Sequence, residues 1–357
     1  MRILFVSKRF PQGRDLLTRP FGRFFHLPAA LAERGHDVRV SLVSHQGATP
    51  GSARIEGLEV SATDIRMAPL DCVAGISRDA VQWSPDWVLG CSDAWIGLIA
   101  ARVARQCHAR LALDAYDDFE SYMTWNLPLH ALWRRALSKA DLVTAAGPQL
   151  ASLLGSHRRR DSSPVVVVPM AADPAFRPMD RQQSRVALGL PERSPLLGYS
   201  GSWSNNRGSH LLVDGFRHLR SLIPDVQLIL TGRRPARPIE EEGIRSLGYV
   251  EDALLPTVIN AMDACAVVTA DTRFGRGSYP VKLCEAMACG VPVVATATEP
   301  VRWMLGAHAG LATPLGEARL FGDAAAAALG MGRVGYRTNT WEDSANLLEQ
   351  ALLERSG

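Results

Sequence analysis

The feature that most constrains the fold is the alternation of short apolar runs with segments of helical periodicity along all 357 residues. In the first half, these runs predict buried parallel strands at 2–7, 38–43, 86–92, 110–115, 141–146 and 164–169. In the second half, they predict strands at 195–201, 226–232, 244–250, 265–270 and 291–297. Strand, helix and strand repeated in this way are typical of a doubly wound parallel sheet. We therefore predict an α/β protein with two Rossmann-like domains in series.

A proline-rich segment separates the two sets of strands. "VPMAADPAFRPMDRQQS" contains Pro169, Pro174 and Pro178, which suit an extended connection better than a helix or a central strand. We place the domain boundary there, which gives domains of 1–170 and 171–335. The remaining segment, 336–357, reads as one amphipathic helix with Thr340 as N-cap and Asp343 in a weak capping box, and we expect it to return to the first domain.

Composition excludes several classes of protein. The formal net charge of +3 is too small for a chain of this length to suggest a nucleic-acid-binding surface. The six cysteines form no C-x-x-C pair, so we expect a reducing compartment and no structural metal. No apolar run approaches the length of a membrane span, and "MRILFVSKRF" does not resemble a signal peptide. We expect a cytoplasmic protein. The basic run 157–160 reads as a solvated loop, which would attract an anionic membrane surface if it faced one.

Ligands of open parallel sheets bind beyond the carboxyl ends of the strands, where loops meet helix N-termini. After the strand at 195–201, Gly201 and Ser202 offer backbone amides, and Arg207 with Gly208 precedes a helix. The partial positive charge of a helix start and a full guanidinium charge suit an anion such as phosphate. An ordinary solvent-facing arginine at a helix start is the alternative.

The stretch "GSYPVKLCEAMACGVPVVATATEP" contains a second helix start of this kind. The helix is predicted to begin near Tyr279 or Pro280, because proline is favoured at the first helical position. Lys282 and Glu285 then project from one face. The lysine can neutralise phosphate oxygens, whereas the glutamate can accept hydrogen bonds from a diol such as a ribose. A surface ion pair on a helix is the alternative reading.

These segments resemble a known family. "YPVKLCEAMACGVPVVAT", "GYSGSWSNNRGSHLL", "GYVEDALLPTVINAMDACAVV" and "TWEDSANLLEQALL" are similar to the C-terminal half of the GT-B glycosyltransferases, specifically the retaining enzymes of family 4. "GRFFHLPAALAERGHDVRV" and "ADLVTAAGPQLASLLG" with "VVVVPMAADPAFRP" are similar to its N-terminal half and its domain crossover. The resemblance implies the GT-B architecture, with two domains facing a cleft, a nucleotide diphosphate sugar as donor substrate, and neither a metal nor a cofactor.

The resemblance also assigns donor-side residues. Arg207 stands where the family has a basic residue that contacts the donor diphosphate, and Glu285 matches the second glutamate of its E-x7-E motif. The first glutamate of that motif would fall at Gly277 and is absent, while Lys282 fits the variant P-x-K-x-x-E. This departure leaves the donor sugar open. The full set of predicted donor-binding residues is Gly201, Ser202, Arg207, Gly277, Ser278, Tyr279, Lys282, Leu283 and Glu285.

On the acceptor side, "LALDAYDDFESY" follows the fourth predicted strand. Relatives often carry a D-x-H-D or YD-x-x-DD pattern there. Asp114, Asp117 and Asp118 match the second form, and Tyr116 replaces the histidine of the first form. Three carboxylates at one strand end repel one another, which indicates a role beyond packing. A cation site and a solvated acidic loop are the alternatives to an acceptor-side role. The predicted acceptor-side residues are Gly22, Arg23, His26, Tyr116, Asp117 and Asp118.

The function that follows from the resemblance is retaining glycosyl transfer to an acceptor hydroxyl, in glycan, cell-surface polysaccharide or glycoconjugate biosynthesis. Arg207 and Lys282 would stabilise the charge that develops on the leaving diphosphate, and either Asp117 or His26 would assist the acceptor as a base. Lipid-linked glycans, polysaccharides and small molecules stay open as acceptors, as does peripheral membrane contact. A sugar-nucleotide epimerase, a phosphorylase or a non-catalytic partner subunit with the same fold is the alternative.

Overall fold

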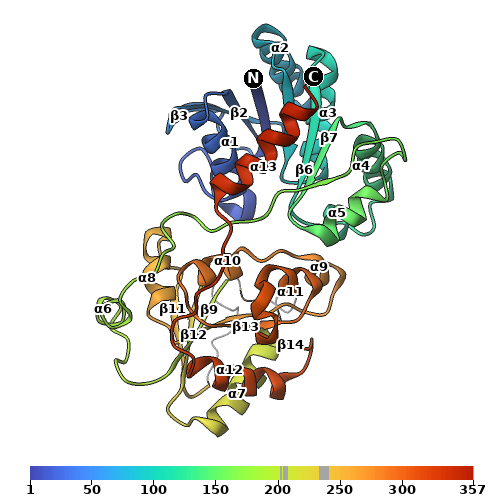
Figure 1. The fold of residues 1–357 in the computed structure, drawn as a ribbon. Coiled ribbons are helices and arrows are strands. Elements are labelled where there is room, and N and C mark those ends of the chain that lie inside the picture. The colour runs from blue at the N-terminus through green and yellow to red at the C-terminus, as the bar shows by residue number, and fades with distance from the viewer. Residues whose placement is uncertain (202, 204–207, 233–240, 357) are drawn as a thin grey trace. The chain divides into compact units, whose positions relative to one another are not determined.

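The computed structural model describes residues 1–201, 203, 208–232 and 241–356. Ser202 and Arg207, two of the predicted donor-binding residues, lie outside the described residues. The chain divides into two compact units (Figure 1). Unit 1 consists of Met1–Met170 and the segment from Asn339 onward, and unit 2 of Ala171–Thr338.

Unit 1 contains an eight-stranded sheet with the strand order β3-β4-β2-β1-β5-β6-β7-β8. The strands are β1 (Arg2–Lys8), β2 (Asp37–Ser44), β3 (Gly51–Ile55), β4 (Leu58–Asp64), β5 (Trp87–Cys91), β6 (Arg110–Ala115), β7 (Leu142–Ala145) and β8 (Val166–Val167). Neighbouring strands pair in parallel except for the antiparallel hairpin of β3 and β4, which the apolar runs did not predict. The remaining six strands lie at the predicted runs.

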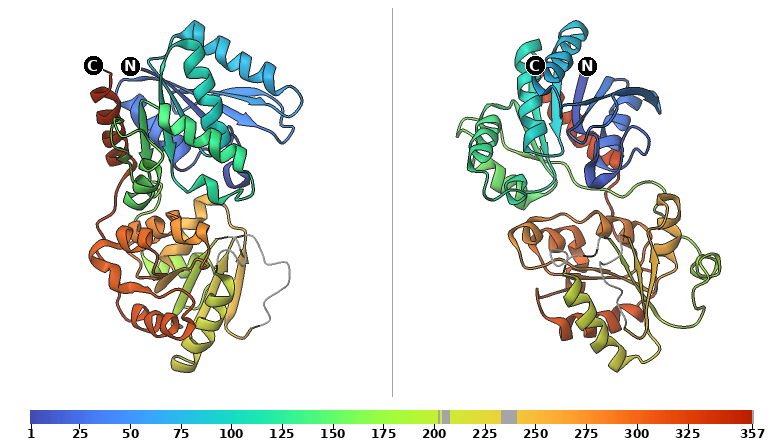
Figure 2. Two further views of the ribbon diagram at one scale, coloured as in Figure 1. Left: turned by 90° about the vertical axis from the view of Figure 1, so that its right-hand side faces the viewer. Right: turned by 180° about the vertical axis from the view of Figure 1, so that it is seen from behind.

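Two layers of helices cover this sheet. They are α1 (Arg23–Glu33), α2 (Pro69–Trp83), α3 (Ala94–Cys107), α4 (Leu127–Lys139), α5 (Pro148–Gly155) and α13 (Trp341–Glu354). Helix α1 packs against α13, and α3 packs between α2 and α4, so that the two groups lie on opposite faces of the sheet (Figure 2). The strands β1, β5 and β6 between them are almost continuously buried, as expected for parallel strands covered on both faces.

Unit 2 contains a six-stranded parallel sheet with the order β11-β10-β9-β12-β13-β14. The strands are β9 (Leu196–Ser200), β10 (Gln227–Thr231), β11 (Ile244–Gly248), β12 (Ala264–Val267), β13 (Val293–Thr296) and β14 (Ala312–Thr313). The helices are α6 (Arg181–Ala187), α7 (Ser209–Leu222), α8 (Leu255–Asn260), α9 (Arg273–Gly277), α10 (Val281–Ala288), α11 (Glu299–Leu305) and α12 (Ala318–Leu329). Alternate residues of β9 enter two apolar cores: Leu196 packs with α8, α10 and α11, whereas Leu197 packs with α7 and α12. Both faces of the sheet are therefore covered.

The C-terminal helix α13 belongs to unit 1. Its predicted capping box is confirmed, because the Asp343 amide donates to Thr340 Oγ1 at 3.0 Å and the Thr340 amide donates to Asp343 Oδ2 at 2.9 Å. Its apolar face is buried, and Glu349 on its polar side accepts from Arg34 Nε at 2.8 Å. Ser344 Oγ also donates to the carbonyl of Pro169 at 2.9 Å. Through this hydrogen bond, α13 fixes the chain at Pro169, just before it leaves unit 1 at Met170.

Within the described part of the chain, every helix is too short or too polar to cross a lipid bilayer.

Candidate active site

The amino end of α7 meets the loop that follows β12 at the carboxyl edge of the unit 2 sheet. Gly208 is the N-cap of α7 and has a φ of 70°, a conformation that favours glycine. A Cβ at this position would lie 3.0 Å from the carbonyl carbon of Thr269, so a side chain would force the helix start away from the loop. The first amides of α7 have no partner within the helix and carry partial positive charge. This helix start is suited to binding an anion.

Two glycines bring the loops after β9 and β10 into contact beside this helix start. The Gly201 amide donates to the Thr231 carbonyl at 2.9 Å, and Gly232 has a φ of 125°. A Cβ on Gly232 would lie 2.1 Å from the carbonyl oxygen of Gly201, which no side chain can occupy. Glycine at both positions therefore lets the two loops approach closely at the carboxyl end of β9, where the Tyr199 hydroxyl also lies beside Gly201; the donor-side role of Gly201 stays a prediction.

Lys282 and Glu285 lie in the first two turns of α10, which follows β12 on the same edge of the sheet. Lys282 Nζ is 3.2 Å from Glu285 Oε2. The glutamate side chain is only 10% exposed, compared with 34% for the lysine, so the pair is not the surface ion pair of the alternative reading. Glu285 Oε2 is buried and accepts no hydrogen bond from the residues that the structure describes. A buried carboxylate oxygen with unused acceptor capacity is unusual in a folded protein.

The other predicted donor-side residues lie around this helix start. The helix begins at Val281 with Pro280 as N-cap, which corrects the predicted start by one or two residues. Ser278 and Tyr279 are buried, and the Tyr279 ring packs edge-on against Trp303 with 6.0 Å between ring centroids. Gly277 ends the short helix α9.

Leu283 belongs to α10. Its side chain lies in the apolar core that α10 shares with β13. Because the side chain faces the core, a donor could meet Leu283 only through its backbone, and the donor-side role of this residue stays a prediction.

Sequence patterns did not indicate a pair of threonines at the carboxyl ends of β12 and β13. The Thr269 amide donates to Thr296 Oγ1 at 3.0 Å, and the two hydroxyl oxygens are 3.1 Å apart. Both side chains are buried. They join the loop that contacts Gly208 to the neighbouring strand. In the sequence, the pair could have been recognised by the threonine that stands near the end of each of the two apolar runs.

Arg23 and Asp114 form a buried ion pair in unit 1. Arg23 Nε and Nη2 each lie 2.6 Å from an oxygen of Asp114, and the two side chains are 1% and 2% exposed. Arg23 Nη1 donates to the carbonyl of Val168 at 2.8 Å and also lies 3.2 Å from that of Pro169. Thr144 Oγ1 donates to Asp114 Oδ1 at 2.5 Å. All three guanidinium nitrogens are engaged, which corrects the predicted acceptor-side role of Arg23 and removes Asp114 from the expected group of repelling carboxylates.

Asp117 and Asp118 follow the carboxyl end of β6, where the sequence predicts them. Asp117 accepts from the Tyr122 hydroxyl at 2.7 Å, and Asp118 accepts from the Glu120 amide at 3.1 Å as the cap of a short 3-10 helix. Tyr116 is buried beside them, and burial, together with the Asp117 carboxylate, raises the pKa of its hydroxyl. These groups form a compact polar cluster at one strand end, not a solvated acidic loop.

Gly22 and His26 flank the buried arginine on α1. Gly22 is the N-cap of α1 with a φ of 62°, and an added Cβ would meet no atom within 4 Å. The His26 ring stacks on Trp341 of α13, with 5.6 Å between centroids. The open space at Gly22 fits the predicted position for an acceptor, whereas His26 also serves the packing of α13.

The basic run at 157–160 is not simply a solvated loop. Arg158 donates to the carbonyls of Leu137 and Ala140 at the end of α4, and burial lowers the pKa of its guanidinium. Arg159 pairs with Asp161 at 3.0 Å. The described residues contain no group of three or more His, Cys, Asp and Glu side chains placed to hold a metal.

Comparison with known proteins identifies the family of the chain. Residues 23–171 match the family model of the glycosyl transferase 4-like domain, and residues 194–330 match that of the glycosyl transferases group 1. A phosphatidyl-myo-inositol mannosyltransferase of Propionibacterium freudenreichii is 30% identical over 162 residues, which are 45% of this chain and 39% of that protein. A D-inositol 3-phosphate glycosyltransferase of Jonesia denitrificans is 26% identical over 249 residues, 56% of this chain and 58% of that protein. The matched part thus spans about two-fifths to three-fifths of these relatives.

Solved structures of similar fold cover the whole chain. Sucrose-phosphate synthase from Thermosynechococcus elongatus superposes with a TM-score of 0.73 at 15% identity, over 99% of this chain and 98% of that one. Anabaena HepE in complex with UDP and glucose superposes with a TM-score of 0.70 at 17% identity, over 100% and 95%. At this identity the likeness establishes the GT-B fold alone. The two family models, which together span most of both units, show that the chain belongs to the group 1, family-4-like glycosyl transferases.

Proposed function

We propose that the protein is a retaining glycosyltransferase, which moves a sugar from a nucleoside diphosphate sugar to an acceptor hydroxyl without a metal ion or cofactor. Family membership supports the reaction class. HepE, which shares the fold, has been solved with UDP-glucose, which supports a nucleotide-sugar donor. The relatives named as phosphatidyl-myo-inositol mannosyltransferase and D-inositol 3-phosphate glycosyltransferase support a phosphorylated or lipid-linked polyol acceptor as one candidate. A role in polysaccharide or glycoconjugate biosynthesis fits each of these acceptors.

The observation that carries the proposal is the buried carboxylate of Glu285. Its Oε2 atom has only the Lys282 ammonium nearby, at 3.2 Å, and accepts no hydrogen bond within the described residues. A carboxylate only accepts hydrogen bonds, and its two oxygens can accept one from each of the two hydroxyl groups of a ribose. Burying a charged acceptor without using it costs free energy, and a bound ribose would remove that cost.

The diphosphate of the donor would lie against the start of α7. Departure of the sugar leaves negative charge on this group, and the helix amides, together with Lys282 and Arg207, would stabilise that charge more in the transition state than in the ground state. Gly201 and Gly232 leave room for the phosphates to approach the backbone. In this proposal the acceptor hydroxyl attacks on the face from which the diphosphate leaves, so the anomeric configuration is retained.

Asp117 is the proposed contact for the acceptor hydroxyl. It lies at the carboxyl end of β6 and is held by the Tyr122 hydroxyl, which fixes its orientation. A carboxylate there can accept the hydroxyl hydrogen of an acceptor and orient its oxygen for attack. Replacing Asp117 by asparagine should lower kcat with little change in donor affinity, because the residue acts on the acceptor.

A thermal-shift screen of the purified protein tests the donor site directly. UDP-, GDP-, ADP- and TDP-sugars and the free nucleotides are the probes, since a ligand that binds only the folded state raises Tm. We expect one base to give a clear shift that Glu285→Ala abolishes. If no nucleotide shifts Tm, the donor assignment fails. Product analysis by NMR then gives the anomeric configuration, and inversion would contradict the retaining mechanism.

Two other functions have specific observations in their favour. The absence of the first motif glutamate, where Gly277 stands, favours a non-catalytic partner subunit, which would bind a nucleotide sugar tightly and turn over no acceptor. An epimerase would convert the donor to an isomer with no acceptor present. Both outcomes are read in the same assay by omitting and then varying the acceptor.

Peripheral membrane contact remains part of the proposal. Trp125 is 78% exposed and Leu127 is 69% exposed at the start of α4, and Arg135 and Lys139 are exposed on the same helix. Exposed aromatic and basic side chains favour the interface of an anionic bilayer. Co-sedimentation with phosphatidylglycerol vesicles, but not phosphatidylcholine vesicles, is expected, and Trp125→Ser with Leu127→Ser should abolish it. Equal recovery of both proteins in the supernatant would remove the membrane from the proposal.

A further inference from the structure

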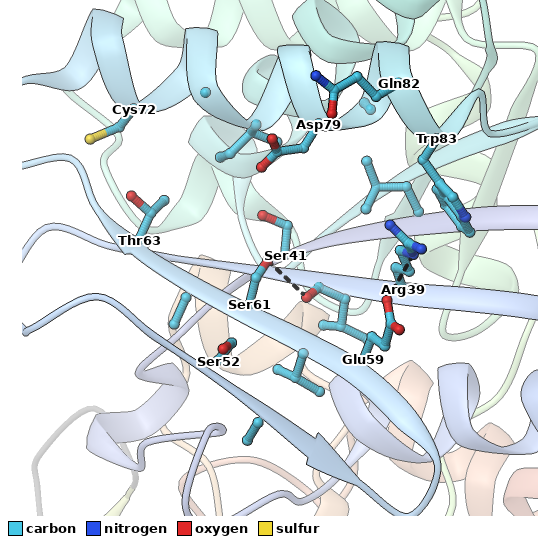
Figure 3. A pocket seen from close by; sticks show the side chains of 18 of the residues that line it. Arg39, Ser41, Ser52, Glu59, Ser61, Thr63, Cys72, Asp79, Gln82 and Trp83 are labelled. Atoms are coloured by element: carbon cyan, nitrogen blue, oxygen red, sulfur yellow. Dashed lines mark hydrogen bonds and ion pairs between the residues drawn. The ribbon is translucent and has the colours of Figure 1, made fainter.

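A second pocket lies in unit 1, away from the carboxyl ends of the central strands. It has a volume of about 940 Å³ and is enclosed by α2 on one side and by one face of β2, β4 and β3 on the other (Figure 3). Pockets that bind small molecules typically measure about 300–1,000 Å³, so the space is large enough for a ligand. We call it the α2 groove.

The face of the sheet that forms the α2 groove is polar, although a sheet of this class normally has apolar residues on both faces. Alternate residues of β2 and β4 face opposite ways. Val38, Val40 and Leu42, with Leu58, Val60 and Ala62, are buried. The polar residues between them line the groove, namely Arg39, Ser41, Glu59, Ser61 and Thr63, joined by Ser52 and Arg54 of β3; apolar residues, among them Leu4, Val40, Val60 and Ile76, complete the lining. The sequence thus keeps one face apolar and makes the other hydrophilic.

Strand register places these side chains in rows. Ser41 is opposite Ser61 in the parallel pair of β2 and β4, and Ser61 is opposite Ser52 in the antiparallel pair of β4 and β3. Adjacent strands lie about 4.8 Å apart, so three hydroxyl groups cross the floor at that spacing. In the next row, Glu59 lies between Arg39 and Arg54, and Arg39 Nε is 3.0 Å from Glu59 Oε2.

The hydroxyl row has unused hydrogen-bonding capacity. Ser41 is only 5% exposed, yet its hydroxyl makes no hydrogen bond with any residue in the described ranges, and it points into the groove (Figure 3). Ser61 Oγ reaches the Val40 carbonyl only at 3.5 Å, the outer limit of a hydrogen bond. The Ser41 oxygen is open to the groove, so it can exchange hydrogen bonds with a ligand that enters.

The opposite wall and one end of the groove add complementary groups. Asp79 and Gln82 extend from α2 over the serines, and Trp83 closes the end with the Arg39 guanidinium 4.6 Å above its ring (Figure 3). Carboxylates accept pairs of hydrogen bonds, the amide and guanidinium donate them, and hydroxyls do both. An indole offers an apolar surface beside them. The acidic and basic side chains balance, which disfavours a polyanion such as nucleic acid.

We propose that the α2 groove is an accessory binding site for a segment of glycan, two or three sugar rings long. Vicinal hydroxyls of a sugar match the rows of hydroxyl, carboxylate and amide groups, and a groove open along the strands admits a chain. Strands β2, β1 and β5 lie between β4 and β6, so β4, which carries Glu59 and Ser61 of the groove, is about 19 Å from β6 at 4.8 Å per strand. Its lining contains none of the predicted donor or acceptor residues, and it does not depend on the proposed transfer reaction.

The test is binding of the full chain to an array of immobilised oligosaccharides, followed by calorimetric titration with maltotriose, α-mannotriose and myo-inositol. We expect a trisaccharide to bind. The double variant Ser41→Val and Ser61→Val removes two hydroxyls while keeping residues that suit strands, and it should weaken that binding about tenfold or more, the scale of two lost hydrogen bonds. Gln82→Ala, at an exposed helix position, serves as a second variant that leaves the sheet intact.

Ser246→Val, at an exposed position of the edge strand β11 in unit 2, is the matched control and should leave glycan binding unchanged. The nucleotide-sugar thermal shift of every variant shows that the chain is folded and separates this site from the donor site. Absence of trisaccharide binding, binding that Ser41→Val with Ser61→Val and Gln82→Ala leave intact, or binding of myo-inositol alone would each overturn the proposal.

Discussion

Replacing Glu285 by glutamine should weaken donor binding without destabilising the protein. In a purely structural ion pair, removal of one partner lowers stability. Here Lys282 is one-third exposed and lies three residues away on the same helix, so the pair contributes only about 0.3–0.5 kcal/mol. Against this small loss, the variant relieves a buried carboxylate oxygen with no hydrogen bond, which costs about 1–3 kcal/mol. The free energy of unfolding without ligand should therefore stay constant or rise by up to about 2 kcal/mol.

The expected effect on the donor is larger and opposite in sign. Two hydrogen bonds from ribose hydroxyls to a charged acceptor contribute about 1.5–3 kcal/mol each, and glutamine can accept at one oxygen only. Loss of about 3 kcal/mol corresponds to an increase in Kd of about a hundredfold. The same change should appear for the free nucleotide diphosphate and for the nucleotide sugar, because the residue contacts the part that they share.

Calorimetric titration measures Kd, and chemical denaturation measures stability on the same preparations. Asp225→Asn is the matched control, because it removes one negative charge from an exposed position at the opposite edge of the unit 2 sheet. It should change neither quantity by more than about 0.5 kcal/mol. A Glu285→Gln protein that is destabilised by 2 kcal/mol or more, as a rough threshold, and that binds nucleotide normally would refute the reasoning and return Glu285 to a structural role.

Three further perturbations follow from the contacts. Asp114→Leu leaves the Arg23 guanidinium buried without a counter-charge, so the free energy of unfolding measured in urea should fall by about 3–5 kcal/mol. Adding Arg23→Met should restore part of this free energy, and a double variant as unstable as Asp114→Leu would contradict an ion-pair origin. Arg34 holds the pKa of Glu349 below its usual range, while burial opposes this effect and His36 assists it, so the contact stabilises the fold fully above about pH 4.3 and stops doing so as pH falls through the lowered pKa. Glu349→Gln should therefore lower Tm at pH 7 and make Tm less dependent on pH in the acid range. Curves of Tm against pH that run parallel for the two proteins would contradict this. Gly232→Ala places a methyl group 2.1 Å from the Gly201 carbonyl and should abolish the nucleotide thermal shift, whereas an unchanged shift would show that this loop pair does not shape the site.

Periodicity predicted the central strands of both sheets because those strands are buried on both faces and read as continuous apolar runs. It missed the hairpin of β3 and β4, where apolar and polar residues alternate and the polar face lines the α2 groove. Both helix starts of the donor side were predicted, since glycine and proline mark them in the sequence.

Tertiary pairing was the part that local patterns could not supply. Arg23 and Asp114 are 91 positions apart, and nothing in either segment indicates that each neutralises the other. Without that pairing, Arg23 reads as a free cation near a substrate, and Asp114 as a third repelling carboxylate. The same limit applies to Ser41, whose lack of a partner is visible only once β4 and α2 are placed beside it.

The return of α13 to unit 1 has a consequence for biosynthesis. The chain leaves the ribosome N-terminus first, so residues 1–170 emerge before α13 is made. The surface of α1 that later contacts Trp341, Leu348 and Leu352 of α13 is then still uncovered. Unit 2 is complete before that surface is closed. The nascent protein therefore exposes an apolar patch on α1 during the synthesis of some 170 further residues, and a stop codon before α13 would leave that patch open in the released chain. A frameshift late in the gene would then act as an aggregation mutation in unit 1, although the codons for residues 1–170 are unchanged.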